Sequence, residues 1–170
     1  QPSEIRLLNI ASGPCRDLLE LYEDETIQTK IQTTCVEMDE HAIAYSKKMV
    51  QKHSGKINFI KKNILRFNCD EKFDIIWSAG LFDYFNDAVF VCLLQRMKKW
   101  LKPNGRIVIG NFNQDHNPSR TYMEVMGEWF LEHRSEAHLL ALAQEAGYKN
   151  CKIAVEREQE NVNLFLNISF

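Results

Sequence analysis

The chain has 170 residues, 45% of them hydrophobic, and a formal net charge of −2. This length suits one domain with a substantial core, and the near-neutral charge gives no electrostatic case for binding nucleic acid or an anionic membrane. The five cysteines are widely spaced without a Cys-x-x-Cys pair, so we expect reduced thiols and no metal site. The sequence contains neither a membrane-spanning run nor a signal peptide, and we expect a protein of the cytoplasm.

The first half of the chain alternates predicted strands and helices. Apolar residues over 5–10 predict a buried strand, which ends at the small residues Ala-Ser-Gly-Pro and leads into a helix near 15–24. Strands are predicted over 31–38 and 57–60, with an amphipathic helix over 41–52 between them. Residues 63–72 are short and polar and predict a loop with one turn. Because the strand signal begins by Ile5, we expect residues 1–170 to be one domain of a longer chain.

The second half continues this alternation and then changes direction. A fourth strand over 73–78 precedes a helix that Asn86 or Asp87 caps and that extends to Leu101. The turn at 102–105 leads into a fifth strand over 106–112, and helices are expected over 121–132 and 135–146. Strands over 149–156 and 162–169 flank a polar turn and predict a hairpin. The order predicts an α/β fold, Rossmann-like and doubly wound, with a mostly parallel seven-stranded sheet that ends in an antiparallel β-hairpin.

Four segments of this fold are candidates for ligand binding, because open parallel sheets bind ligands beyond the carboxyl ends of their strands. They are residues 11–15, 37–39, 63–64 and 79–84. Small residues at 11–15 let a ligand approach the backbone, and the following helix offers free N–H groups. Glu37 can accept both hydroxyls of an adenosine ribose. The alternative for Glu37 is a solvent-exposed acid at the end of a strand. The small-residue turn at 11–15 disfavours this alternative.

Several motifs resemble those of class I S-adenosylmethionine-dependent methyltransferases, and the similarity covers nearly the whole chain. Residues 7–17, Leu-Leu-Asn-Ile-Ala-Ser-Gly-Pro-Cys-Arg-Asp, resemble motif I, and residues 36–43 resemble motif II. Residues 73–80 resemble motif IV, and residues 101–107 resemble the turn into the fifth strand. More narrowly, residues 79–85 and 128–134 are similar to a bacterial branch described as extracellular factor proteins.

The resemblance implies that S-adenosylmethionine is the cofactor and that its methyl group passes to a small-molecule acceptor by in-line displacement. The implied cofactor contacts fall on nine residues: Ala11, Ser12, Gly13, Ala79 and Gly80 at the methionine end, Glu37 at the ribose, and Met38, Asn63 and Ile64 at the adenine.

Two departures from the family pattern concern the same site. The usual Gly-x-Gly-x-Gly retains only Gly13, with Ala11 and Cys15 at the outer positions. A left-handed turn at either residue would be costly, which bears on cofactor affinity and not on the fold. Asn63 also stands where an aspartate is common in the family.

The candidates for orienting or deprotonating the acceptor are Asp83 and Tyr84, directly after the fourth strand. Asp83 is the one charge among Phe82, Tyr84 and Phe85, and such surroundings raise the pKa of a carboxyl group. The alternative is that Asp83 caps a turn before the next helix. Further polar candidates are His116, Arg120, Tyr122, Glu128 and Arg134.

Two other functions stay open at this point. The altered glycines are compatible with a catalytically silent methyltransferase-like domain that serves in binding or interaction. A nicotinamide-dependent oxidoreductase is less favoured, because the glycines of G-x-G-x-x-G are missing.

Overall fold

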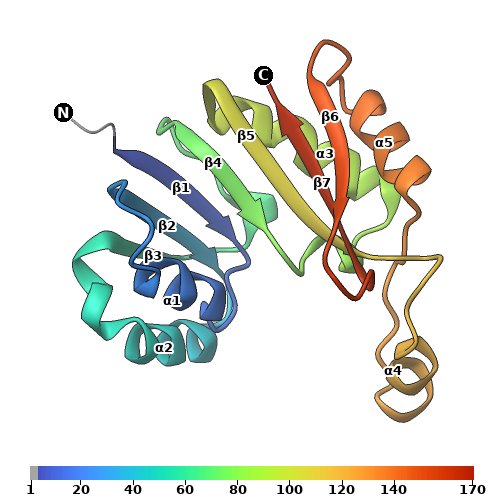
Figure 1. Cartoon of the computed structure of the whole chain (residues 1–170), viewed down its shortest axis with the longest axis horizontal. Helices are drawn as coiled ribbons and strands as arrows, with labels where there is room; N and C mark the ends of the chain where they lie inside the picture. Colours follow the sequence, from blue (N-terminus) through green and yellow to red (C-terminus); the bar gives the residue numbers. More distant parts are fainter. Residues whose placement is uncertain (1–3) are drawn as a thin grey trace.

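The computed structural model describes residues 4–170, so residues 1–3 of the expected domain lie outside the described part. Seven strands form one sheet in the order β3-β2-β1-β4-β5-β7-β6 (Figure 1). Neighbouring strands from β3 to β5 are parallel, and β7 is antiparallel to both β5 and β6, which confirms the predicted fold class. The strands are β1 (Ile5–Ile10), β2 (Ile31–Glu37), β3 (Ile57–Lys61), β4 (Phe73–Ser78), β5 (Leu101–Phe112), β6 (Lys152–Arg157) and β7 (Asn163–Ser169).

Helices cover both faces of the sheet. They are α1 (Arg16–Glu23), α2 (Glu40–Met49), α3 (Asp87–Trp100), α4 (Arg120–Met126) and α5 (Glu136–Glu145), with short 3₁₀ helices η1 (Gln51–Lys56), η2 (Ile64–Arg66) and η3 (Phe82–Tyr84). Successive strand residues separate into two buried clusters: Leu7 packs with Leu18 of α1, whereas Leu8 packs with α3 and α5. This alternation follows from the two-residue period of a strand and places the larger core under α3 and α5.

Two predicted helices end earlier than expected. The helix expected over 41–52 ends at Met49 and continues as η1. The helix expected over 121–132 ends at Met126, because the Gly127 N–H bonds back to the carbonyls of Tyr122 and Met123 and Glu128 follows with a φ of 46°. These are the contacts of a helix C-terminus, and they turn the chain back toward the sheet.

Figure 1 shows that α4 projects beyond the end of the sheet at which the parallel strands finish. An isolated β-bridge between Asn113 and Arg134 joins the two ends of the segment that carries α4, residues 114–133. Its apolar side chains are largely exposed: Tyr122, Val125, Met126 and Phe130. Over residues 4–170, no helix is both long and apolar enough to cross a membrane.

Candidate functional site

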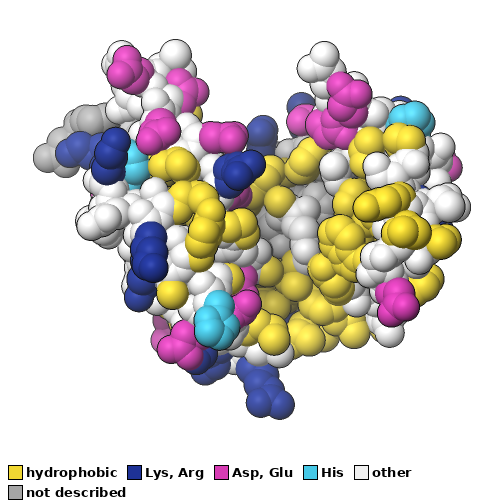
Figure 2. All heavy atoms as spheres, turned by 90° about the horizontal axis from the view of Figure 1, so that it is seen from below, with side chains coloured by type: hydrophobic (Ala, Val, Ile, Leu, Met, Phe, Trp, Pro, Cys, Tyr) yellow, Lys and Arg dark blue, Asp and Glu magenta, His cyan; other side chains and the backbone are white. Residues whose placement is uncertain are grey.

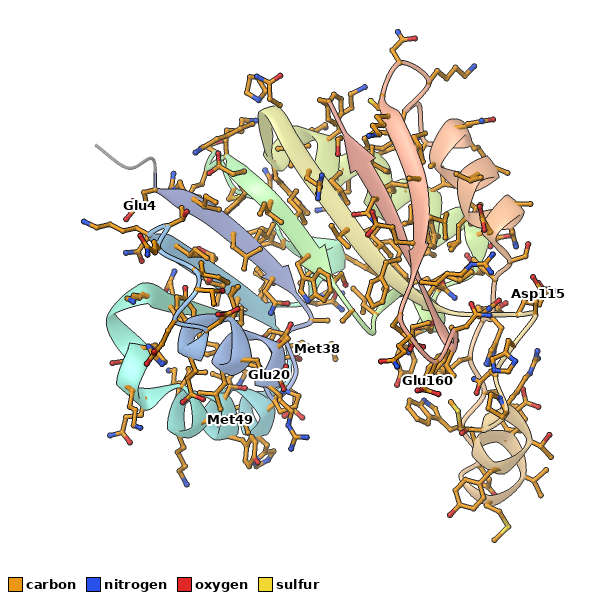
Figure 3. The ribbon with its side chains drawn as sticks, in the orientation of Figure 1. Glu4, Glu20, Met38, Met49, Asp115 and Glu160 are labelled. Atoms are coloured by element: carbon orange, nitrogen blue, oxygen red, sulfur yellow. The ribbon has the colours of Figure 1, made fainter. Side chains whose placement is uncertain are left out.

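The four predicted loops meet at the carboxyl edge of β1, β2, β3 and β4. Two adjoining hollows, of about 410 Å³ and about 320 Å³, share Ala11 in their walls. Figure 2 views this face and shows hydrophobic side chains on both sides of a depression, and Met38, labelled in Figure 3, lies at this end of the strands. All nine predicted cofactor residues line one hollow or the other: Ala11, Glu37, Met38, Asn63 and Ile64 the first, and Ala11, Ser12, Gly13, Ala79 and Gly80 the second.

The loop after β1 has the backbone of a glycine-rich turn with only one glycine. Ala11, Gly13 and Cys15 have φ values of 51°, 49° and 55°. A left-handed conformation costs a non-glycine residue roughly 1–2 kcal/mol, so Ala11 and Cys15 are both strained. Two hydrogen bonds hold the loop in place. The Ala11 N–H donates to the Val36 carbonyl at 2.8 Å, and the Ser46 hydroxyl donates to the Gly13 carbonyl at 2.6 Å.

Glu37 is fixed in place by backbone donors. Its side chain is buried, and Oε2 accepts from the Gly13 N–H at 3.0 Å. Oε1 accepts from the N–H groups of Met38 at 2.7 Å and Asp39 at 3.0 Å. A carboxylate can accept about four hydrogen bonds, and Glu37 accepts three from the backbone, so one lone pair stays free for a hydroxyl donor. A second lone pair becomes free if the Gly13 N–H releases Oε2. The carboxylate therefore joins the β1 loop to the end of β2 before any ligand arrives.

Two polar side chains in the site have unused hydrogen-bonding capacity. Ser12 Oγ is buried and has no hydrogen-bond partner among the described residues. Asn63 Oδ1 accepts from the Leu65 N–H at 2.9 Å and caps η2, which leaves the Asn63 amide N–H groups available as donors. An aspartate at position 63 could only accept, so the asparagine changes the polarity of this contact.

A glycine outside the predicted site residues lets β4 and β5 approach each other beside the second hollow. A Cβ on Gly110 would lie 2.5 Å from the Ala79 carbonyl oxygen, so no larger residue fits there without displacing the backbone. An isolated glycine inside a predicted strand can mark a close approach of two backbones, and Gly110 lies inside the strand predicted over 106–112, so the sequence does indicate this contact.

The structure does not bring the Asp83 carboxylate to either hollow. Asp83 is buried, and its Oδ1 accepts from the Phe112 N–H at 2.7 Å, so the side chain joins η3 to the end of β5. The alternative was that Asp83 caps a turn before the next helix. The turn there, η3, has no side-chain cap, and Asn86 caps α3 by accepting from the Val89 N–H. This placement argues for a structural contact, and a catalytic part for Asp83 stays a prediction.

Tyr84, in contrast, lines the first hollow. Its side chain is 57% exposed, and its hydroxyl oxygen accepts from the Trp129 indole N–H at 3.0 Å. Trp129 lies in the segment that carries α4, residues 114–133, so this hydrogen bond joins that segment to the wall of the hollow. Of the two predicted catalytic residues, Tyr84 is the one that a ligand in the hollow could reach.

Arg134, one of the further polar candidates, is 1% exposed. Its guanidinium donates to the carbonyls of Phe82 and Phe85, to Asn111 Oδ1 and to Asp87 Oδ1. These bonds clamp both ends of η3 to β5 and to the start of α3. Arg134 thus supports the wall that carries Tyr84, which no local pattern in the sequence indicates.

We expect Asp83→Asn to change how stability depends on pH. Burial raises the pKa of Asp83 from 3.8 to about 6, an effect that the Phe112 N–H and Arg134 only partly offset. The folded state thus binds the proton more tightly than the unfolded state, so this stabilisation is present below about pH 4 and is lost as the pH rises through about 6. Asparagine does not titrate and keeps an oxygen for the Phe112 N–H.

Relative to wild type, the variant is therefore expected to gain about 1–3 kcal/mol of unfolding free energy between about pH 4 and pH 7.5. Urea denaturation at both pH values measures this gain. Asp115→Asn, at an exposed position, is the control. Parallel pH profiles for wild type and Asp83→Asn would contradict the prediction.

Comparisons with known proteins give the same fold. A family model described as "Methyltransferase domain" matches residues 2–160. A possible exported protein of Bordetella parapertussis superposes with a TM-score of 0.80 at 19% identity, over 97% of this chain and 61% of that one. The 1,6-didemethyltoxoflavin-N1-methyltransferase of Burkholderia thailandensis, bound to its substrate and S-adenosylhomocysteine, gives 0.73 at 17% identity, over 98% and 71%.

A third structure is the magnesium protoporphyrin IX methyltransferase of Synechocystis PCC 6803 with S-adenosylhomocysteine, with a TM-score of 0.73 at 9% identity over 99% of this chain and 75% of that one. The chain spans about half to three-fifths of the length of the first structures it matches. No curated protein is similar enough in sequence to count as a relative. Since the family model covers nearly all of the sequence, the chain belongs to the methyltransferase domain family.

Proposed function

We propose that this domain binds S-adenosylmethionine in the two adjoining hollows and transfers its methyl group to a small-molecule acceptor. The observation that carries the proposal is the gathering of the nine predicted residues, from four loops far apart in sequence, around two hollows that share Ala11. The bound S-adenosylhomocysteine of two structural neighbours supports the choice of cofactor. The cysteines are free thiols, which suits a reducing compartment such as the bacterial cytoplasm.

The residues present fit this cofactor. Ser12 offers a buried hydroxyl without a partner, which a polar ligand would satisfy, and a Cβ added to Gly13 or Gly80 would meet nothing within 4 Å. In the proposed arrangement Ser12 and Gly13 hold the methionine end and Glu37 holds the ribose. Asn63 donates its amide to the adenine edge, where Ile64 and Met38 provide apolar contact.

When bound, the cofactor supplies a methyl group on a positively charged sulfur, which is already activated for displacement. The protein must then align the acceptor and exclude water, and orientation alone provides effective molarities of about 10⁵ M or more. Leu81, Tyr84 and Phe85 give the first hollow an apolar wall on the side from which an acceptor would enter. The Tyr84 hydroxyl, positioned by Trp129, is the polar group that would orient the acceptor atom.

Titration calorimetry with S-adenosylhomocysteine and with S-adenosylmethionine tests the proposal. We expect one site per chain with measurable heat at or below millimolar ligand, and a matching increase in melting temperature. NADH serves as the comparison ligand and is expected to give no heat. Binding of NADH with no response to either sulfur compound would overturn the proposal in favour of a nicotinamide enzyme. Cofactor binding without methyl transfer to any acceptor would instead indicate a silent binding domain.

A further inference from the structure

Two cysteine thiols meet beneath the loop that follows β1. The sulfur atoms of Cys15 and Cys35 are 4.0 Å apart, and both side chains are fully buried. Cys15 ends the loop as the N-cap of α1, whereas Cys35 lies within β2. They pack in the smaller core cluster with Leu7, Leu18 and Val50. The pair therefore joins an irregular loop to a strand that is paired on both sides.

The backbone of Cys15 is strained for a cysteine. Its φ of 55° is a conformation that glycine adopts at no steric cost and that other residues rarely adopt. Strain of this kind persists where the surroundings enforce it and is concentrated at functional sites. Cys15 also lies in the wall of the 320 Å³ hollow, so the buried pair sits directly behind the surface of that hollow.

The environment of the pair favours the reactive thiolate at one of its two sulfurs. The neighbouring Cys35 thiol has the largest effect and lowers the pKa of Cys15 to about 7, against the opposing effect of burial. The same contact and burial raise the pKa of Cys35. A cysteine whose neighbour stays protonated can attack as the thiolate, and the neighbour then acts as the resolving thiol.

We propose that Cys15 and Cys35 form an oxidation site, at which hydrogen peroxide converts the two thiols into a disulfide that displaces the cofactor loop. In the first step the Cys15 thiolate attacks one peroxide oxygen, so that an S–O bond forms, the O–O bond breaks and hydroxide leaves. In the second step the Cys35 sulfur attacks the Cys15 sulfenic acid, the S–O bond breaks and water leaves. The two cysteines together lose two electrons and two protons, and one peroxide becomes two waters.

Formation of the disulfide would change the proposed cofactor site, because the loop before Cys15 is less constrained than the strand that holds Cys35. A disulfide requires the sulfurs to approach to about 2.0 Å, roughly half of their present separation. Cys35 is held in β2, which pairs with strands on both sides, whereas Cys15 follows an irregular loop. In the proposed disulfide the loop, and not the strand, is the part that yields, and Ser12, Gly13 and the contact between the Gly13 N–H and Glu37 are displaced with it. This consequence rests on the proposed cofactor site, whereas disulfide formation does not.

Mass spectrometry of peroxide-treated protein tests the oxidation site. Wild type is expected to lose two hydrogen atoms and to yield, on digestion, a linked pair of peptides that contain Cys15 and Cys35. Cys35→Ala is expected to form no such link and to gain one oxygen on Cys15 instead, because the resolving thiol is missing. Cys92→Ala, which changes an exposed cysteine on α3, is the matched control and is expected to form the link as wild type does. Recovery of Cys15 and Cys35 as free thiols from treated wild type would overturn the proposal.

Calorimetry with S-adenosylhomocysteine then tests the effect on the site. Oxidised wild type is expected to bind at least about tenfold more weakly than reduced wild type, and a dithiol reductant is expected to restore the affinity. Reduced Cys35→Ala is expected to bind as reduced wild type does. Equal affinity of the two wild-type forms would refute the displacement of the loop. Failure of the reduced protein to bind would refute the cofactor site, whereas the linked peptides would still establish the disulfide.

Discussion

Replacement of Arg134 by methionine is expected to lower the free energy of unfolding by about 3–5 kcal/mol, because it leaves buried acceptors without donors. Phe82 O and Asn111 Oδ1 lie 3.1 Å and 2.8 Å from the Arg134 guanidinium and are enclosed with it. The guanidinium also lies over the Phe90 ring at 4.8 Å, so methionine replaces a cation–π contact with dispersion alone. Urea denaturation followed by circular dichroism measures the change.

Two variants separate the geometry of Arg134 from its charge. Arg134→Lys keeps the charge but not the planar fork of donors and is expected to lose an intermediate amount of stability. Arg157→Met is the matched control, since Arg157 pairs with Glu136 where the two side chains are 52% and 44% exposed, and it is expected to cost less than about 1 kcal/mol. Equal losses for Arg134→Met and Arg157→Met would show that the buried bonds contribute little.

Replacement of Glu37 by alanine is expected to weaken S-adenosylhomocysteine binding by about 10- to 150-fold, because a hydrogen bond to a charged group contributes roughly 1.5–3 kcal/mol. The structure adds a second cause. Glu37 also accepts from the Gly13 N–H, so its loss releases the loop that is proposed to hold the methionine end of the cofactor. The fold itself is expected to remain, since the rest of the sheet does not depend on this side chain. Calorimetry measures the affinity, and circular dichroism verifies the fold.

Glu40→Ala is the matched control for this experiment. Glu40 lies three residues away, and its side chain is 75% exposed and paired with Lys61. We expect this variant to bind the cofactor product as wild type does. Unchanged affinity for Glu37→Ala would place the ribose contact elsewhere, with Asp39 as the next acid in the same loop. Equal weakening by both variants would point to a general effect of charge.

The sequence by itself determined the framework of the fold and which loops meet at one edge of the sheet. Periods of two and of about 3.6 residues in apolar side chains are local signals, so β4 was predicted with its observed bounds over 73–78. Parallel strands end at one edge of a sheet, and this rule brought loops as distant as those of Ala11 and Ala79 to one site. The cofactor residues that the family resemblance implies lie in these loops and line the two hollows.

Only the tertiary structure decided what the individual polar and sulfur groups do there. Asp83 meets the Phe112 N–H, 29 residues away, and Arg134 meets the Phe82 carbonyl, 52 residues away. The thiols of Cys15 and Cys35 meet across 20 residues and two different elements. Such contacts depend on the direction of a side chain and on the register of strands that pair late in the chain, and no local pattern encodes either. A buried polar group takes the partner that packing brings to it, because leaving it without one costs more than any local preference supplies.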